Sequence, residues 1–141
     1  MEFITVKQFQ EQPVEVQKVF LDWWQPQEFD IYAYKEDLKP RRVTETDIED
    51  VYNNELYNVK SSFVVPLFTE GQLRKFIEDK TSCKLDATFF LWDGYTVEIS
   101  KKYEEEGYCV SQKVFELLGE DLLQAYWEVA CQIAEQLTIK N

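Results

Sequence analysis

The chain has 141 residues, a formal net charge of −12 and no histidine, yet it carries 10 Phe, 8 Tyr and 4 Trp. Without histidine it cannot build Ser-His-Asp or Cys-His catalytic groupings, a histidine-ligated zinc site or a pH switch centred near neutrality. The length predicts a single globular domain over residues 1–141 that can fold without disulfides or a structural metal. The 45% hydrophobic fraction is typical of a folded chain.

The compartment follows from what the chain lacks. Its apolar runs reach only about six residues, far short of a membrane span, and its opening residues resemble no secretory signal. Three cysteines, an odd number, have spacings that fit neither a disulfide framework nor a zinc ribbon. We therefore expect reduced core cysteines (Cys83, Cys109 and Cys131) in a cytoplasmic protein.

The first half of the chain predicts one clear helix and two strands. Helical spacing follows Pro13 and ends before residues 25–27, and a helical turn is possible within residues 5–12. Alternation over 29–34 predicts a strand, and residues 35–54 predict a loop with at most one helical turn. A further strand is expected within 56–65, and Pro66 should place its end at a sheet edge or a turn.

The second half carries firmer local signals. Thr69 and Gln72 form a capping box before a short apolar stripe, which predicts a helix that ends near residue 81. Asp93-Gly94 predicts a two-residue type I′ hairpin between 87–92 and 95–100, and alternation over 108–115 predicts a third strand. After Gly119, a broad apolar face over residues 122–137 predicts a long C-terminal helix.

This order of elements lacks the repeated βαβ rhythm of a parallel sheet. We predict an α+β fold: an antiparallel sheet of four or five strands with the helices packed on it and a long C-terminal helix. The apolar face of that helix is broad enough to exceed what one sheet covers, which favours a homodimer.

The acidic charge makes duplex nucleic acid and anionic membranes poor partners and suits basic proteins, although acidic surfaces also serve solubility alone. The carboxylates we single out belong to an acidic loop and to the last helix: Glu45, Asp47, Glu49, Asp50, Glu128 and Glu135. The two helical glutamates are seven residues apart, so they should project together, about 10 Å from each other. The loop does not fit a calcium site, because Tyr52 stands where a sharp-turn glycine is needed, and we expect no metal and no cofactor.

An alternative site lies in the basic cluster around Arg41 and Arg42. Paired arginines suit phosphate, and an exposed aromatic such as Trp24 or Tyr52 could stack on a base, so a small cyclic nucleotide is the ligand this site would take. Trp23 and Trp24 point about 100° apart on a helix, so we expect one in the core and the other less buried. The net charge opposes a nucleotide ligand.

No GxGxxG, GxxxxGK[ST] or GxSxG motif is present, so no catalytic residue is assigned and we expect a protein that is not an enzyme. Three segments resemble small proteins of phages and prophages of Gram-positive bacteria, clostridial ones in particular: PVEVQKV with DWW (13–24), PLFTEGQLRKFIEDK (66–80) and DLLQAYW (121–127). The resemblance brings no activity; it implies an accessory phage protein, and many of these interfere with host defence.

Three functions follow as hypotheses. The first is a host-defence inhibitor that binds a basic host protein, such as a nuclease, by presenting carboxylates where phosphates would sit. The second is a sponge that sequesters a small cyclic-nucleotide immune signal. The third is a structural or assembly component of the phage.

Overall fold

The computed structural model describes residues 2–44, 64–102 and 109–139. Its helices are α1 (Val6–Gln10), α2 (Val14–Trp23), α5 (Glu70–Thr81) and α6 (Leu122–Ile139). Its strands are β1 (Ile31–Tyr34), β2 (Arg41–Arg42), β3 (Val64–Pro66), β4 (Lys84–Leu91), β5 (Gly94–Lys102) and β6 (Cys109–Phe115). The strands form two antiparallel sheets of three strands each, in the orders β2-β1-β3 and β4-β5-β6.

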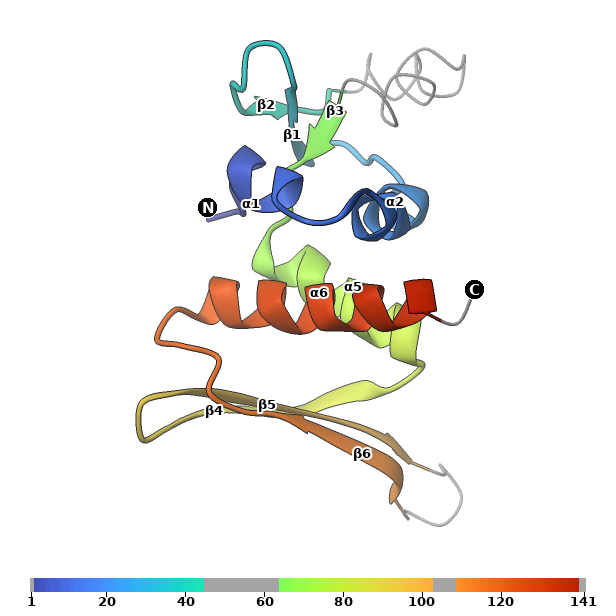
Figure 1. Ribbon diagram of the computed structural model, residues 1–141, viewed down its shortest axis with the longest axis vertical. Coiled ribbons are helices and arrows are strands. Elements are labelled where there is room, and N and C mark those ends of the chain that lie inside the picture. Colours follow the sequence, from blue (N-terminus) through green and yellow to red (C-terminus); the bar gives the residue numbers. More distant parts are fainter. Residues whose placement is uncertain (1, 45–63, 103–108, 140–141) are drawn as a thin grey trace.

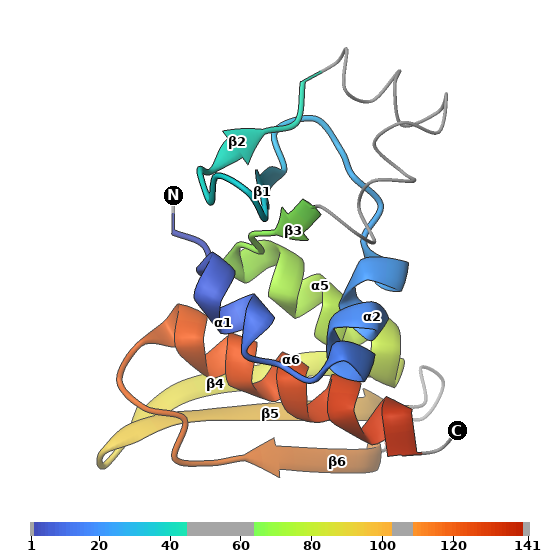
Figure 2. The same cartoon turned by 45° about the horizontal axis from the view of Figure 1, so that its top comes forward.

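The elements are stacked in layers along the long axis of the molecule (Figure 1). The smaller sheet lies at the top, α1 and α2 lie beneath it, α5 and α6 form the next layer, and the larger sheet closes the bottom. Figure 2 shows α6 lying along the larger sheet beside α5, with α1 and α2 on the side of these helices that faces away from the sheet. The fold is therefore α+β and antiparallel, as predicted.

The prediction of a single sheet of four or five strands is wrong. The larger sheet holds only β4, β5 and β6, because helices cover one of its faces and separate it from the other sheet. The smaller sheet recruits β2 from the segment predicted to be loop, and Tyr32 of β1 pairs with Arg41 on one side and Pro66 on the other. Pro66 lies on an edge strand, where its missing N–H breaks no ladder, as predicted.

Local capping signals explain where two of the helices begin. In α5, the amide of Gln72 donates to Thr69 Oγ1 at 3.4 Å and the amide of Thr69 donates to Gln72 Oε1 at 2.9 Å, which is the predicted capping box. In α6, the amide of Gln124 donates to Asp121 Oδ1 at 2.9 Å, so Asp121 caps the predicted C-terminal helix. Pro13 is the N-cap residue of α2 rather than its first helical residue.

The core is centred on Phe20 of α2. Its ring centroid lies 4.5 Å from that of Phe76, 5.1 Å from that of Trp127 and 5.6 Å from that of Phe68, so side chains from α2, α5 and α6 meet there. On the opposite side of α6, the Tyr126 hydroxyl lies 2.7 Å from Thr88 Oγ1 of β4. Helices and sheet together cover most of the apolar face of α6 within one chain, and a homodimer stays a prediction.

Candidate functional site

The β4–β5 hairpin turns one residue earlier than the sequence predicts. Leu91 pairs with Gly94, so the two turn residues are Trp92 and Asp93, not Asp93 and Gly94. Among the turn residues only Trp92 has a positive φ, of 59°, whereas a type I′ turn requires positive φ at both. A bulky side chain in the left-handed region is strained by about 1 kcal/mol or more.

The outer end of this hairpin carries large apolar side chains in solvent. Trp92 is 86% exposed, and the three residues before it (Phe89, Phe90 and Leu91) are also exposed. Because successive strand residues point to opposite faces, these side chains occupy both faces of the hairpin end. Leu117, which follows β6, is 78% exposed and also has a positive φ, of 56°. We call Phe89 to Trp92 with Leu117 the apolar tip.

Backbone contacts hold the two parts of the apolar tip side by side. The amide of Tyr95 donates to the carbonyl of Gly119 at 2.8 Å, and the amide of Leu118 donates to the carbonyl of Tyr95 at 3.1 Å. The start of β5 is thus paired with the connection that leads from β6 to α6. The segments that carry the apolar tip are therefore joined to each other by backbone hydrogen bonds.

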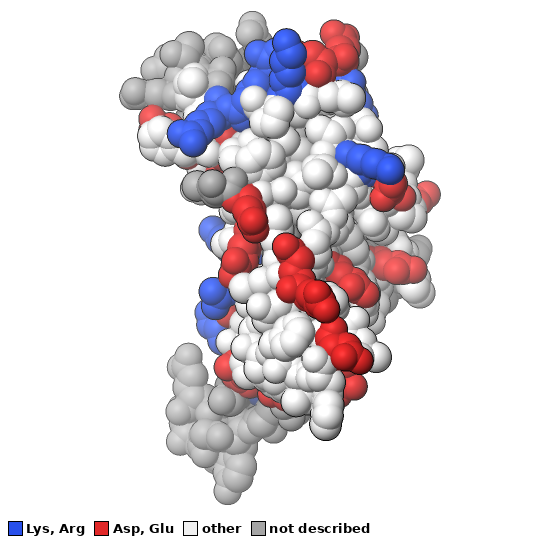
Figure 3. Space-filling view, turned by 90° about the vertical axis from the view of Figure 1, so that its left-hand side faces the viewer, with Lys and Arg blue, Asp and Glu red and all other residues white. Residues whose placement is uncertain are grey.

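Exposed carboxylates lie close to the apolar tip in the sequence. The turn supplies one and the β6–α6 connection supplies three: Asp93, Glu116, Glu120 and Asp121. We call these four the acidic rim. No Lys or Arg occurs between Val114 and Ile139. In Figure 3, most carboxylates of this face lie in its middle and lower parts, among white surface, whereas most Lys and Arg lie near the top.

The predicted acidic face of the last helix continues from this rim. Asp121, Glu128 and Glu135 are exposed and lie seven residues apart, so they share one face of α6. Glu128 and Glu135 flank the half-buried thiol of Cys131, whose pKa is raised first by burial and then by these two carboxylates. We call the three carboxylates the acidic stripe. On the neighbouring strand, Lys113 Nζ donates to Gln136 Oε1 at 2.9 Å, so one base reaches α6 from outside it.

The acidic loop residues Glu45, Asp47, Glu49 and Asp50, together with Tyr52, lie outside the described residues. Their part in binding stays a prediction.

Three residues of the predicted nucleotide site, Arg41, Arg42 and Trp24, lie among the described residues. Arg41 forms an ion pair with Asp37 and lies 5.1 Å from the centroid of the Tyr34 ring, and Asp37 holds the pKa of Arg41 above its usual range. Arg42 is the next residue of the same strand, so the two guanidinium groups project to opposite faces. The expectation that Trp24 is exposed is wrong, because it is 1% exposed.

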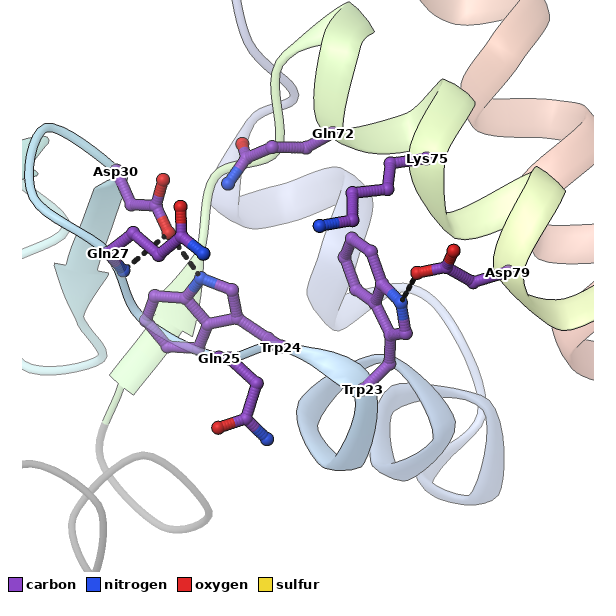
Figure 4. A pocket seen from close by; sticks show the side chains of 8 residues that line it. All are labelled: Trp23, Trp24, Gln25, Gln27, Asp30, Gln72, Lys75 and Asp79. Carbon is purple, nitrogen blue, oxygen red and sulfur yellow. Dashed lines mark hydrogen bonds between the residues drawn. The ribbon is translucent and has the colours of Figure 1, made fainter.

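The two adjacent tryptophans instead line a hollow of about 280 Å³. As predicted, one of the two tryptophans is in the core and the other is less buried: Trp24, which follows the last residue of α2, is buried, and Trp23 is half-buried. Figure 4 shows the side chains around the hollow, which come from the end of α2, from the segment that follows it and from α5. They are Trp23, Trp24, Gln25, Gln27, Asp30, Gln72, Lys75 and Asp79.

Neither the apolar tip nor the α5 side of this hollow was predicted from the sequence. A signal existed for the first, since Phe89 to Trp92 is an apolar run that abuts a turn. A signal also existed for the second, because Gln72, Lys75 and Asp79 have helical spacing on one face. Neither pattern shows from sequence alone which side is left uncovered.

Comparison with known protein families, with curated proteins and with solved structures finds no match to this chain. Among the described residues, no helix is long and apolar enough to cross a membrane.

Proposed function

We propose that the chain is a non-enzymatic binding protein that docks a basic partner protein against its apolar tip and acidic rim. The observation that supports this most is the strained, 86% exposed Trp92, which lies in a turn whose own residue Asp93 and whose paired β6–α6 connection carry four exposed carboxylates. Exposed aromatic residues in the centre of such a surface are the usual hot spots of protein interfaces. Strained backbone is retained where function needs the side chain it presents.

The carboxylates set the chemistry of the partner. The acidic rim and the acidic stripe together extend along α6 in steps of about 10 Å, the rise of seven helical residues. A basic surface that normally holds nucleic acid would meet carboxylates there in place of phosphates, and complementary charge would speed its association. The apolar tip would then fix the complex by burying Trp92.

The biological setting of this proposal rests on the resemblance to phage proteins. An accessory phage protein of this kind would act in the cytoplasm of the host cell as an inhibitor of a nucleic-acid-binding defence protein, such as a nuclease. Its acidic surface would compete with the nucleic acid for that protein.

The test begins with capture at low salt from an extract of a Gram-positive host, followed by purification of the retained protein and measurement of its affinity. The retained protein should be basic, and its affinity should fall as salt rises. Trp92→Ser should weaken binding by about thirtyfold, the loss expected of a hot-spot aromatic. The purified complex should also exclude nucleic acid from the partner.

Phe29→Ser is the matched control, because Phe29 is also an exposed aromatic residue with positive φ but lies next to β1, away from the apolar tip. It should bind as the wild type does. A partner that is not basic, or one that binds Trp92→Ser as tightly as the wild type, overturns the proposal. So does binding of the wild type to neutral lipid vesicles that Trp92→Ser abolishes, since the apolar tip would then serve a membrane.

A further inference from the structure

The hollow beside Trp23 and Trp24 shares no residue with the apolar tip, the acidic rim or the acidic stripe. It lies between the end of α2 and one face of α5. Binding at the hollow is therefore independent of the proposed function, and each can fail without the other.

Two carboxylates in the wall of the hollow are held in place by indole groups. Asp30 Oδ2 accepts from Trp24 Nε1 at 3.1 Å and from the amide of Gln27 at 3.0 Å. Asp79 Oδ2 accepts from Trp23 Nε1 at 2.9 Å. The Trp23 ring is itself fixed edge-on against Phe76, with centroids 5.3 Å apart. These walls are already ordered, which lowers the entropic cost of binding a ligand.

The opposite wall carries an ammonium group. Figure 4 shows the Lys75 side chain reaching into the hollow above the Trp23 ring, with the amide nitrogen of Gln72 turned the same way. Lys75 forms no ion pair with Asp30 or Asp79, although all three residues are described. Its charge nevertheless acts on Asp30: burial raises the pKa of that carboxyl, and Lys75 is among the groups that oppose the rise. A positive and a negative group thus face the same hollow without touching.

Charge balance selects the ligand. The hollow is lined by one ammonium and two carboxylates, so a ligand with net negative charge would be repelled, and a ligand with positive charge alone would leave Lys75 without a partner. A small molecule that carries both charges fits best, because its carboxylate can accept from Lys75 Nζ and Gln72 Nε2 while its ammonium donates to Asp30. We propose that the hollow binds a free zwitterionic α-amino acid between Lys75 and Asp30.

The probes are the free α-amino acids, added one by one to the ¹⁵N-labelled full chain. The indole N–H resonances of Trp23 and Trp24 report on the hollow directly, because both indoles donate to carboxylates in its wall. At least one amino acid should shift these two resonances in a saturable manner. Lys75→Met and Asp30→Asn should each weaken that binding by about tenfold or more, the usual loss of a charge-assisted hydrogen bond.

Lys18→Met is the matched control, since it removes an exposed lysine from α2 outside the hollow. It should bind as the wild type does, and the indole resonances of unliganded Lys75→Met should keep their dispersion, which shows that the variant is folded. The inference is overturned if no amino acid shifts the two indole resonances, or if Lys75→Met binds as tightly as the wild type. It is also overturned if a neutral sugar binds there and the amino acids do not.

Discussion

Gly94 and Gly119 touch through their backbones: a Cβ atom added at Gly94 would lie 3.0 Å from the amide nitrogen of Gly119 and 3.3 Å from its carbonyl oxygen. This close approach joins the start of β5, next to the turn that carries Trp92, to the connection before α6, which carries Leu117. The surface that we propose for binding therefore depends on a contact that leaves no room for a methyl group.

Gly94→Ala should destabilise the fold by about 1–3 kcal/mol, because backbone atoms of Gly119 must move to admit the added methyl group. Gly71→Ala is the control: no atom lies within 4 Å of the added Cβ, and alanine favours the helix there by up to about 1 kcal/mol. Urea unfolding of the two variants measures both effects. Equal stability of Gly94→Ala and wild type would show that the two segments separate freely.

Phe20→Ala should cost about 3–5 kcal/mol of unfolding free energy, since it opens a cavity where α2, α5 and α6 meet. Phe20→Leu keeps most of the volume and should cost less. Chemical unfolding followed by tryptophan fluorescence gives both values. A loss below about 1 kcal/mol for the alanine variant would mean that the aromatic cluster is not the centre of the core.

Asp30 should make the unfolding free energy depend on pH. Burial raises the pKa of its carboxyl in the folded state above the usual range, so the folded state favours the protonated form. This contribution is fully present below the unfolded pKa and is lost as pH rises through the folded pKa. The stability of the wild type relative to Asp30→Asn should therefore increase as the pH is lowered from neutral through that window. Unfolding curves at a series of pH values test this, and a constant difference would contradict it.

Reversal of the acidic stripe, in the double variant Glu128→Lys and Glu135→Lys, should change the unfolding free energy by no more than about 1 kcal/mol, because both side chains are exposed. It should slow association with a basic partner much more than it speeds dissociation. Stopped-flow association rates at low salt give the comparison. An unchanged association rate would show that the acidic stripe does not take part in binding and is only a solvated surface.

The same variant has an internal reporter in Cys131. Two carboxylates near its thiol would become ammonium groups, so its pKa should fall and alkylation should become faster. Burial is the larger cause of the raised pKa and is unchanged, so the thiol should remain slower than a free cysteine. Peptide mapping after timed alkylation separates Cys131 from the other cysteines.

Local signals predicted the elements well, while contacts between distant segments decided the rest. The capping box at Thr69 and the apolar periodicity before Leu137 each lie within one helix, so sequence alone was enough to find them. Tyr32 pairs with Arg41 across a connection that lacks a clear turn signal, and with Pro66 from a segment far along the chain, so no local pattern predicts the smaller sheet. For the same reason one sheet was predicted where two exist.

The hairpin register failed for a related physical reason. Asp93-Gly94 has the composition of a type I′ turn, but Gly94 is used where β5 meets Gly119. The left-handed conformation then falls on Trp92, which local propensity disfavours. The Trp24 prediction failed because adjacent helical positions show that one tryptophan is buried but do not show which. The hollow was not predicted because Asp30 and Lys75 are far apart in the sequence and line the same hollow only in the folded chain.

The position of α6 in the layers has a consequence for synthesis on the ribosome. It is translated after every other described element, yet Trp127 completes the cluster around Phe20 and Tyr126 reaches β4. Nascent chains that end before residue 122 must therefore leave apolar faces of α2, α5 and the larger sheet in water. Such chains are exposed to chaperones and proteases until α6 emerges, so the tertiary fold described here can form only after α6 has been synthesised.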